Sequence, residues 1–177
     1  MNATQRISAP RRLWLRWRFH LSALLVLIPL GFMPAYFHEA RLDRGLGGLG
    51  EREVGELQVG PWSVRLAEWE TGAPELEGRA GYMKAFTLAF CVECDPQVRA
   101  AYLRIGQPRD LRTAGALLSG SPSRRFVEVP VPARARPDDA LWLTVEGWDG
   151  SVRQTSIPLA QASPSLVAWL QQRGKNQ

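Results

Sequence analysis

Histidine and cysteine are scarce in this sequence, whose 177 residues contain only His20, His38, Cys91 and Cys94. Both histidines precede residue 40, so the rest of the chain has no imidazole with which to build a Ser-His-Asp triad. A metal centre with several histidine ligands is excluded for the same reason. The sequence leaves an enzymatic role open, but it favours a non-enzymatic protein without a cofactor or metal site of its own.

Carboxylates are more common, and two pairs of them stand close in sequence. Glu68 and Glu70 form one pair, and Asp138 and Asp139 form the other. Paired carboxylates can carry out acid–base chemistry when the fold holds them face to face. On strands and turns they usually belong to solvated faces, so we expect no catalysis from these residues.

Most of the chain also lacks an excess of positive charge. The formal net charge is +5, and the first 20 residues contain five arginines and no acid. The remaining residues carry 17 basic and 17 acidic side chains, because the five arginines are part of a total of 22 basic residues. A nucleic-acid-binding domain needs excess positive charge on its folded surface, so we expect no nucleic-acid partner.

One long segment, residues 21–37, contains no charged side chain and reads LSALLVLIPLGFMPAYF. It approaches the roughly 20 apolar residues that cross a bilayer. Because the arginines precede this segment and Glu39 follows it, the positive-inside rule places the N-terminus in the cytoplasm. We predict a basic cytoplasmic tail over residues 1–20, a single transmembrane helix over residues 21–37 in contact with membrane lipid, and export of the following residues.

The N-terminal segment has two other interpretations besides an uncleaved anchor. A cleaved signal peptide needs small residues in an A-x-A-like arrangement, and the stretch MPAYFHEA does not offer a convincing one. Arg11 and Arg12 resemble a twin-arginine export signal, but Arg16 and Arg18 separate them from the apolar run. The sequence therefore favours a protein of the bacterial inner membrane with its C-terminal part in the periplasm of a Gram-negative cell.

The exported part is expected to begin with a flexible segment. Residues 38–56 are rich in glycine and charged side chains, a composition typical of a tether. Residues 57–177 then form the predicted periplasmic domain, which is long enough for one hydrophobic core.

Alternation of apolar and polar residues predicts strands throughout this domain. The pattern runs over residues 58–68, 82–92, 125–131, 141–146 and 151–157. Asp149 and Gly150 lie between the last two segments and predict a tight hairpin turn. Ser163 and Pro164 are a typical N-cap and first residue of a short terminal helix. We expect a mainly β fold, an immunoglobulin-like β-sandwich with a short C-terminal helix.

Residues 95–105, DPQVRAAYLRI, fit two secondary structures. Asp95 and Pro96 could begin a helix with Val98, Ala101, Tyr102 and Ile105 on one face, or a turn could lead into a strand. A strand fits the β-sandwich. A helix would instead favour a thioredoxin-like α/β domain, because that fold places Cys-x-x-Cys at the start of a helix.

Cys91 and Cys94 form the one motif that carries chemistry. In an oxidising compartment they should pair, so the first interpretation is a structural disulfide. Covalent haem attachment needs histidine where Asp95 stands, and a metal site needs more ligands than two thiolates. Catalytic thiol–disulfide exchange by Cys91 and Cys94 remains as the alternative.

Several motifs resemble bacterial accessory membrane proteins. Residues 125–159, RFVEVPVPARARPDDALWLTVEGWDGSVRQTSIPL, are similar to the FixH-like proteins of respiratory-oxidase assembly. Gly60-Pro61-Trp62, the Phe-Cys-x-x-Cys-Asp stretch at residues 90–95 and the LWLTV stretch at residues 141–145 resemble single-pass proteins that accompany ferric-siderophore reductases. These resemblances imply a helper in a redox or metal-handling complex, with no catalytic residue carried across.

The sequence thus predicts a membrane-anchored accessory or assembly subunit whose partner is a multi-pass inner-membrane protein, in iron-siderophore reduction or a respiratory oxidase. Trp69 and Trp148, which have no evident core role, are candidate partner contacts. The alternative is a membrane-tethered thiol–disulfide oxidoreductase that uses Cys91 and Cys94.

Overall fold

The computed structural model describes residues 9–42 and 48–175. The chain divides into two units, Met1–Ala40 and Arg41–Gln177, which are described separately below. Residues 1–8 of the predicted basic tail and residues 43–47 of the predicted tether lie outside the described residues.

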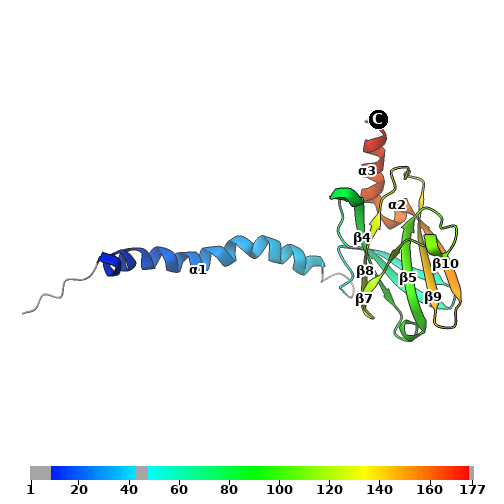
Figure 1. Ribbon diagram of the computed structural model, residues 1–177, viewed down its shortest axis with the longest axis horizontal. Coiled ribbons are helices and arrows are strands. Elements are labelled where there is room, and N and C mark those ends of the chain that lie inside the picture. Colours follow the sequence, from blue (N-terminus) through cyan, green and yellow to red (C-terminus); the bar gives the residue numbers. More distant parts are fainter. Residues whose placement is uncertain (1–8, 43–47, 176–177) are drawn as a thin grey trace, which may run out of the picture. The chain divides into compact units, whose positions relative to one another are not determined.

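The described part of the N-terminal unit lies in one long helix, α1 (Ala9–Leu42), which contains the predicted helix over residues 21–37 (Figure 1). Its apolar side chains are exposed, among them Leu25 at 75% and Phe32 at 69%. Among the described residues, no helix combines the length and apolar character needed to cross a membrane. The helix is therefore confirmed, whereas its predicted role as a transmembrane span is not.

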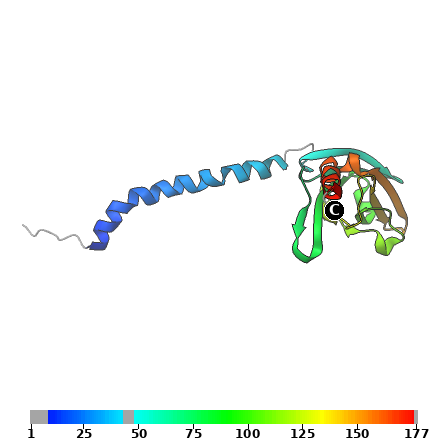
Figure 2. The same cartoon turned by 90° about the horizontal axis from the view of Figure 1, so that it is seen from above.

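The C-terminal unit is mainly β, as predicted, and its described strands form two antiparallel sheets (Figure 2). The first sheet has the order β1-β2-β4-β8-β7, with β3 paired to β4. Its strands are β1 (Arg52–Val59), β2 (Trp62–Glu68), β3 (Glu75–Glu77), β4 (Gly81–Phe90), β7 (Ser119–Ser121) and β8 (Arg124–Pro130). The second sheet has the order β10-β9-β5-β6 and consists of β5 (Val98–Ile105), β6 (Ala116–Leu117), β9 (Ala140–Gly147) and β10 (Val152–Pro158).

One hydrophobic core lies between the two sheets. Phe86 and Leu88 of β4 and Leu103 of β5 are fully buried in it, together with Leu141 and Leu143 of β9. Most of their neighbours along the strands are polar or partly exposed, which is the pattern that a buried sheet face imposes on its sequence, whereas Ala89 is buried in a separate small cluster with Leu49 and Ala67. The core therefore follows the alternation read from the sequence.

The domain begins earlier than the predicted boundary at residue 57. Leu49 is 1% exposed, and β1 starts at Arg52 inside the segment predicted to be a tether. Gly55 has a φ of 126° and stands at a register shift in the pairing of β1 with β2. Gly55 thus supplies a positive φ value for an irregular strand, a use that composition does not distinguish from a linker.

The predicted strand over residues 58–68 is in fact the end of one strand and the whole of the next. Gly60, with a φ of 62°, and Pro61 form the turn between β1 and β2. The alternation over this segment is borne out at Trp62, Val64 and Leu66, whose side chains are all buried. Apolar residues continue on both sides of this turn, so the sequence pattern does not reveal it.

The hairpin between β9 and β10 is confirmed. Gly150 has a φ of 79°, and the backbone N–H of Ser151 donates to the Asp149 carboxylate at 2.9 Å. Hydrogen bonds from the side chain and the backbone of Ser151 hold the pKa of Asp149 below its usual range. Asp149 therefore stays ionised, and its carboxylate stabilises the turn by accepting these hydrogen bonds.

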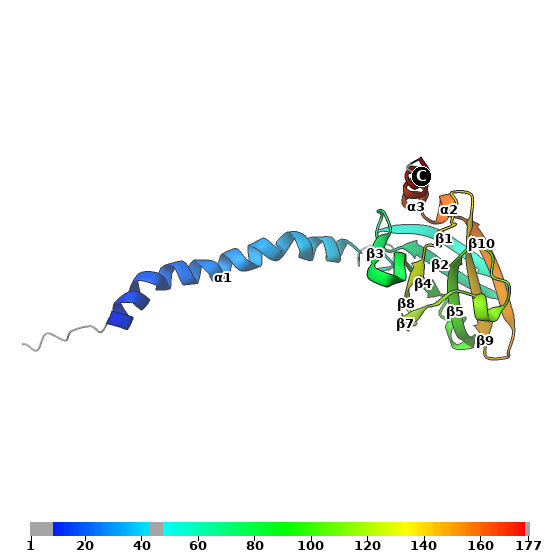
Figure 3. The same cartoon turned by 45° about the horizontal axis from the view of Figure 1, so that its top comes forward.

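The C-terminal helix is confirmed as α3 (Pro164–Lys175), and a short helix α2 (Leu159–Ala162) precedes it. Leu166 and Leu170 of α3 are buried. Both helices follow β10 at the end of the sheets opposite the turn between β9 and β10 (Figure 3). Short 3-10 helices occur at Gly78–Ala80, Asp95–Gln97 and Leu111–Thr113.

Residues 95–105 form a single 3-10 turn followed by strand β5, so the thioredoxin-like alternative is wrong. A β-bulge between Val98 and Ala100 shifts the pairing of β5 with β9. Because of the extra residue, Val98 and Ala101 are both buried, and their spacing of three resembles a helical repeat. The bulge is the physical reason for the ambiguity in the sequence.

Candidate functional site at the disulfide loop

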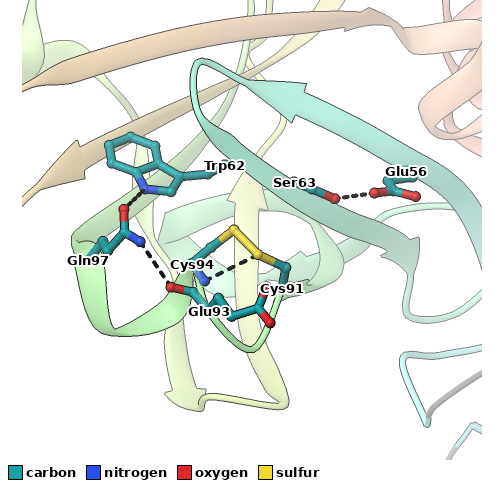
Figure 4. The surroundings of a disulfide bond; sticks show 7 residues. All are labelled: Glu56, Trp62, Ser63, Cys91, Glu93, Cys94 and Gln97. Atoms are coloured by element: carbon teal, nitrogen blue, oxygen red, sulfur yellow. Dashed lines mark hydrogen bonds between the residues drawn. A yellow bond between two sulfur atoms is a disulfide. The ribbon is translucent and has the colours of Figure 1, made fainter.

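Cys91 and Cys94 are joined by a disulfide in the loop that leads from β4 to β5, with their Cα atoms 5.0 Å apart (Figure 4). This disulfide loop, residues 91–94, connects the two sheets at one end of the core. The predicted pairing of the two cysteines is present in the structure, and no free cysteine occurs among the described residues.

Backbone hydrogen bonds hold the loop in a tight turn. The N–H groups of Cys94 and Asp95 donate to the Cys91 carbonyl oxygen at 3.0 and 3.1 Å. The Cys91 N–H donates to the carbonyl oxygen of Ser63 on β2 at 3.0 Å. The Cys94 N–H also lies 3.2 Å from the Cys91 sulfur, so it points at both acceptors of that residue.

The two sulfur-bearing residues differ in their access to solvent. Cys94 is 6% exposed and belongs to the core, whereas Cys91 is half-buried. Cys91 lines a cavity of about 210 Å³, together with Glu56, Ser63, Arg65, Ala89, Phe90 and Val92. Val92 is 90% exposed beside it. The loop therefore presents one cysteine to a surface cavity and keeps the other inside.

An ion pair fixes the residue that follows the loop. Arg125 of β8 donates to the Asp95 carboxylate at 2.6 Å, and its guanidinium carbon lies 4.9 Å from the centre of the Phe90 ring. Both charged side chains are largely buried, at 14% and 17% exposure. The charge of Asp95 is therefore compensated next to the disulfide.

Gln97 links the disulfide loop to two other segments. Its amide donates to the Glu93 carbonyl oxygen at 3.0 Å, and its side-chain oxygen accepts from Trp62 Nε1 at 3.3 Å (Figure 4). The backbone N–H of Trp148 donates to the Gln97 carbonyl oxygen at 3.0 Å. One glutamine thus joins the loop, the start of β2 and the turn between β9 and β10.

A second cavity, of about 330 Å³, opens at the same end of the domain. It is lined by Pro61, Trp62, Gln97, Trp148, Asp149, Ser151 and Arg153. Trp148 is 69% exposed, and the Arg99 guanidinium carbon lies 6.0 Å from the centre of its ring. We call the surface formed by these residues and the disulfide loop the loop end of the domain.

Trp69, the other tryptophan predicted to contact a partner, lies elsewhere and packs edge-on against Phe126.

Glu68 does not belong to a solvated face, contrary to the prediction. It is fully buried, and its carboxylate accepts from Lys84 Nζ at 2.9 Å and from Arg52 Nε at 2.8 Å. Ser163 and Ser165 donate to the same carboxylate. The alternation in β2 indicates this burial, because Glu68 continues the inward face on which Trp62, Val64 and Leu66 lie.

The surroundings of Glu68 keep it ionised. Burial alone would raise its pKa, but hydrogen bonds from Ser163, Ser165, Arg52 and Lys84 outweigh burial and lower the pKa below its usual value. Lys84 is itself held by the carbonyl oxygens of Glu70 and Gly72. These ion pairs and hydrogen bonds join three strands to the C-terminal helix. Because the network is buried inside the fold, we interpret it as structural and not catalytic.

A further cavity, of about 160 Å³, lies over β3, β4 and β8 and has an acidic lining of Glu70, Glu75, Glu77 and Glu128. Across the described ranges, no group of three or more histidine, cysteine, aspartate or glutamate side chains is arranged to hold a metal ion. The loop end is thus the one place in the described domain where a cysteine pair, aromatic side chains and cavities come together.

Comparison with known proteins gives one family. No curated protein and no solved structure matches the chain. A family model matches residues 13–160, which include most of α1 and every strand of the described domain. The family model therefore covers both the helix and the strands of the domain. The chain belongs to the family described as Uncharacterised conserved protein UCP029505.

Proposed function

We propose that the protein is an accessory subunit of a bacterial inner-membrane complex, with α1 as its attachment to the membrane and its β domain in the periplasm. Its partner would be a multi-pass protein of redox or metal handling, of the iron-siderophore-reduction or respiratory-oxidase type that the sequence motifs resemble. In this role the domain holds or completes its partner.

The observation that carries the proposal is the apolar surface of α1. Its uncharged segment exposes large apolar side chains without a polar face, from Leu21 at 45% and Leu25 at 75% to Phe37 at 49%. A helix that is apolar on all sides is stable only in apolar surroundings. Trp14 and Trp17 precede this segment, at the position where aromatic side chains meet a membrane surface.

The disulfide supports a periplasmic location. Disulfides persist in oxidising compartments such as the bacterial periplasm and are rare in the cytosol. Cys91 and Cys94 are paired, and within the described residues no group of three or more potential metal ligands is present. The direction of α1, with arginines before its apolar segment, favours the same side of the membrane for the domain.

The strand order supports an immunoglobulin-like β-sandwich. Without β1 and β3, the orders β2-β4-β8-β7 and β10-β9-β5-β6 correspond to strands A-B-E-D and G-F-C, with β6 as an added edge strand. The disulfide loop and the turn at residues 147–150 then occupy the B–C and F–G positions, which lie at one end of such a domain. We propose that this loop end, with Trp148 exposed, contacts the partner.

The partner contact is tested by purification of the full chain in mild detergent, with quantitative mass spectrometry of the proteins that accompany it. The wild type should recover a multi-pass haem, copper or iron-handling membrane protein. Trp148→Ala should reduce that recovery several-fold, because exposed tryptophans are often the main contacts of an interface. Leu76→Ala is the matched control, since Leu76 is 65% exposed on β3, near the opposite end of β4. Recovery of the chain alone, turning over a small molecule, would refute the accessory role.

Membrane attachment is tested by cell fractionation with high-salt washing. The wild type should remain with the membranes, and the double variant Leu25→Arg/Ile28→Arg should be released, because each arginine disfavours insertion by about 3 kcal/mol. The matched control is Leu76→Arg/Leu117→Arg, which places two arginines at exposed positions of the domain. A washed wild type found in the soluble fraction would contradict the proposal.

A further inference from the structure

The disulfide contributes little to the shape of its own loop. The turn at residues 91–94 is already held by backbone hydrogen bonds, by the ion pair of Asp95 with Arg125 and by the contacts of Gln97. A bond between residues three apart closes a very small loop, so it restricts the unfolded chain only slightly. The position of this disulfide is therefore poorly suited to a purely structural cross-link.

The two sulfur atoms are also unequal as chemical targets. Cys91 lines a surface cavity of about 210 Å³, whereas Cys94 is 6% exposed and packs in the core. Thiol–disulfide exchange begins when a thiolate reaches one sulfur of the disulfide along the S–S axis. Because Cys91 lines the cavity and Cys94 is buried, Cys91 is the residue of the pair that a partner's thiolate would attack.

The local charges favour a thiolate at Cys91. The Cys94 N–H points at the Cys91 sulfur from 3.2 Å, so it can donate to a negatively charged sulfur. The carboxylate of Asp95, which follows the loop, is neutralised by Arg125 at 2.6 Å, and the cavity beside Cys91 is lined by one acid, Glu56, and one base, Arg65. Glu93 is exposed, where solvent screens its charge. The turn thus provides a hydrogen bond of the kind that a helix N-terminus provides in other Cys-x-x-Cys sites.

We propose that the Cys91–Cys94 disulfide is an exchange site that oxidises a dithiol of a protein partner. A partner thiolate attacks the Cys91 sulfur, and the S–S bond breaks with its electron pair leaving on Cys94. The partner's second thiolate then attacks the partner sulfur of the mixed disulfide and releases Cys91 as a thiolate. The partner loses two electrons and two protons and gains a disulfide, and Cys91 and Cys94 end as thiols. This inference does not depend on the accessory function proposed above.

The asymmetry of the two cysteines is tested with single-cysteine variants of the full chain and with glutathione disulfide as the probe. In Cys94→Ser the remaining Cys91 should form a mixed disulfide with glutathione at neutral pH, seen as a mass increase of the intact protein. In Cys91→Ser the buried Cys94 should react at least roughly tenfold more slowly. Circular dichroism establishes that both variants are folded. Equal rates in two folded variants would overturn the proposal.

The electrostatic part of the proposal is tested in the Cys94→Ser background by the pH profile of the same reaction. Adding Arg125→Gln leaves the Asp95 charge uncompensated, so the reaction should need a higher pH. The further change Asp95→Asn should restore the original profile. Arg173→Gln, which removes an arginine from α3, is the matched control and should leave the profile unchanged. An unmoved profile in Arg125→Gln would refute the assigned role of the ion pair.

The wild-type disulfide gives the third readout. Dithiothreitol should reduce it under native conditions within minutes, as followed by thiol labelling before and after denaturation. A disulfide that becomes reducible only after the domain unfolds would be a buried staple, and the exchange site would be refuted. The co-purification experiment above is unaffected by this outcome, so the two proposals fail separately.

Discussion

Glu68 connects segments of the domain that lie far apart in the sequence. Its carboxylate accepts hydrogen bonds from Arg52 of β1, from Lys84 of β4 and from Ser163 just before α3. A buried charge is tolerated only when ion pairs and hydrogen bonds replace its hydration. Glu68 has that replacement in full, because every buried side-chain polar atom among the described residues has a hydrogen-bond partner.

Replacing Glu68 with glutamine should destabilise the domain by about 3 kcal/mol, because it leaves two cations without their counter-charge. The side chain keeps nearly the same size, so the loss reports on charge. The measurement is urea unfolding of the full chain. Glu77→Gln, at an exposed position on β3, should change the free energy of unfolding by less than about 0.5 kcal/mol. A loss as small as that of the control would show that the network is not stabilising.

The same carboxylate should make stability depend on pH. Its pKa is lower in the folded state than the ordinary value of 4.5, so its contribution is fully present above pH 4.5 and is lost as the pH falls through the folded-state pKa. The difference in free energy of unfolding between the wild type and Glu68→Gln should therefore be constant between pH 7 and about 6 and shrink below pH 4.5. A difference that grows on acidification would contradict this sign.

At the scale of elements, α3 is joined to the sheets by its first turn. Ser163 caps the helix by accepting from the Leu166 N–H at 3.3 Å and also donates to Glu68 at 2.6 Å. Arg52 of β1 adds hydrogen bonds to the carbonyl oxygens of Gln161 and Ala162. The helix therefore docks through polar groups at its start and through Leu166 and Leu170 along its length.

Ser163→Ala should cost about 1–2 kcal/mol of stability, since it removes a cap and one donor to a buried carboxylate. Chemical unfolding measures the loss, and helical circular dichroism reports whether α3 frays. Ser119→Ala, at an exposed serine of β7, controls for the loss of a hydroxyl. If the two variants have the same free energy of unfolding, the polar contacts at the start of α3 do not stabilise the domain.

At the scale of the whole domain, the two sheets and their core supply the stability, and the disulfide is peripheral. The core runs from Trp62 and Phe86 to Leu143 and Leu166, whereas the disulfide closes a turn at one end. A domain of this size does not need a cross-link in order to fold, because it buries enough apolar surface by itself.

The double variant Cys91→Ser/Cys94→Ser should therefore keep its fold and lose about 2 kcal/mol or less, the chain-entropy value for so short a loop. Circular dichroism and urea unfolding measure the two quantities, and reduced wild-type protein is the matched comparison. A variant that fails to fold would make the disulfide a structural requirement and would remove the ground for its exchange role.

The candidate site was only partly predictable. The sequence singles out Cys91, Cys94 and Trp148, and the structure places all three at the loop end. It gives no sign of Gln97, because a polar residue in a turn is common and its three partners come from segments far apart in the chain. The difference in burial between Cys91 and Cys94 likewise depends on how β4 and β5 pack.

Sequence alone determined the features that local chemistry controls. Alternation along β2 and β4 assigned the inward faces, Asp149 and Gly150 set the hairpin, and Ser163 with Pro164 began the helix, because each depends on φ, hydrogen bonding or side-chain direction within a few residues. Tertiary structure decided the rest. It placed Gly55 in strand β1, selected a bulged strand after Asp95 and buried Glu68, since each outcome depends on partners that only folding brings within reach.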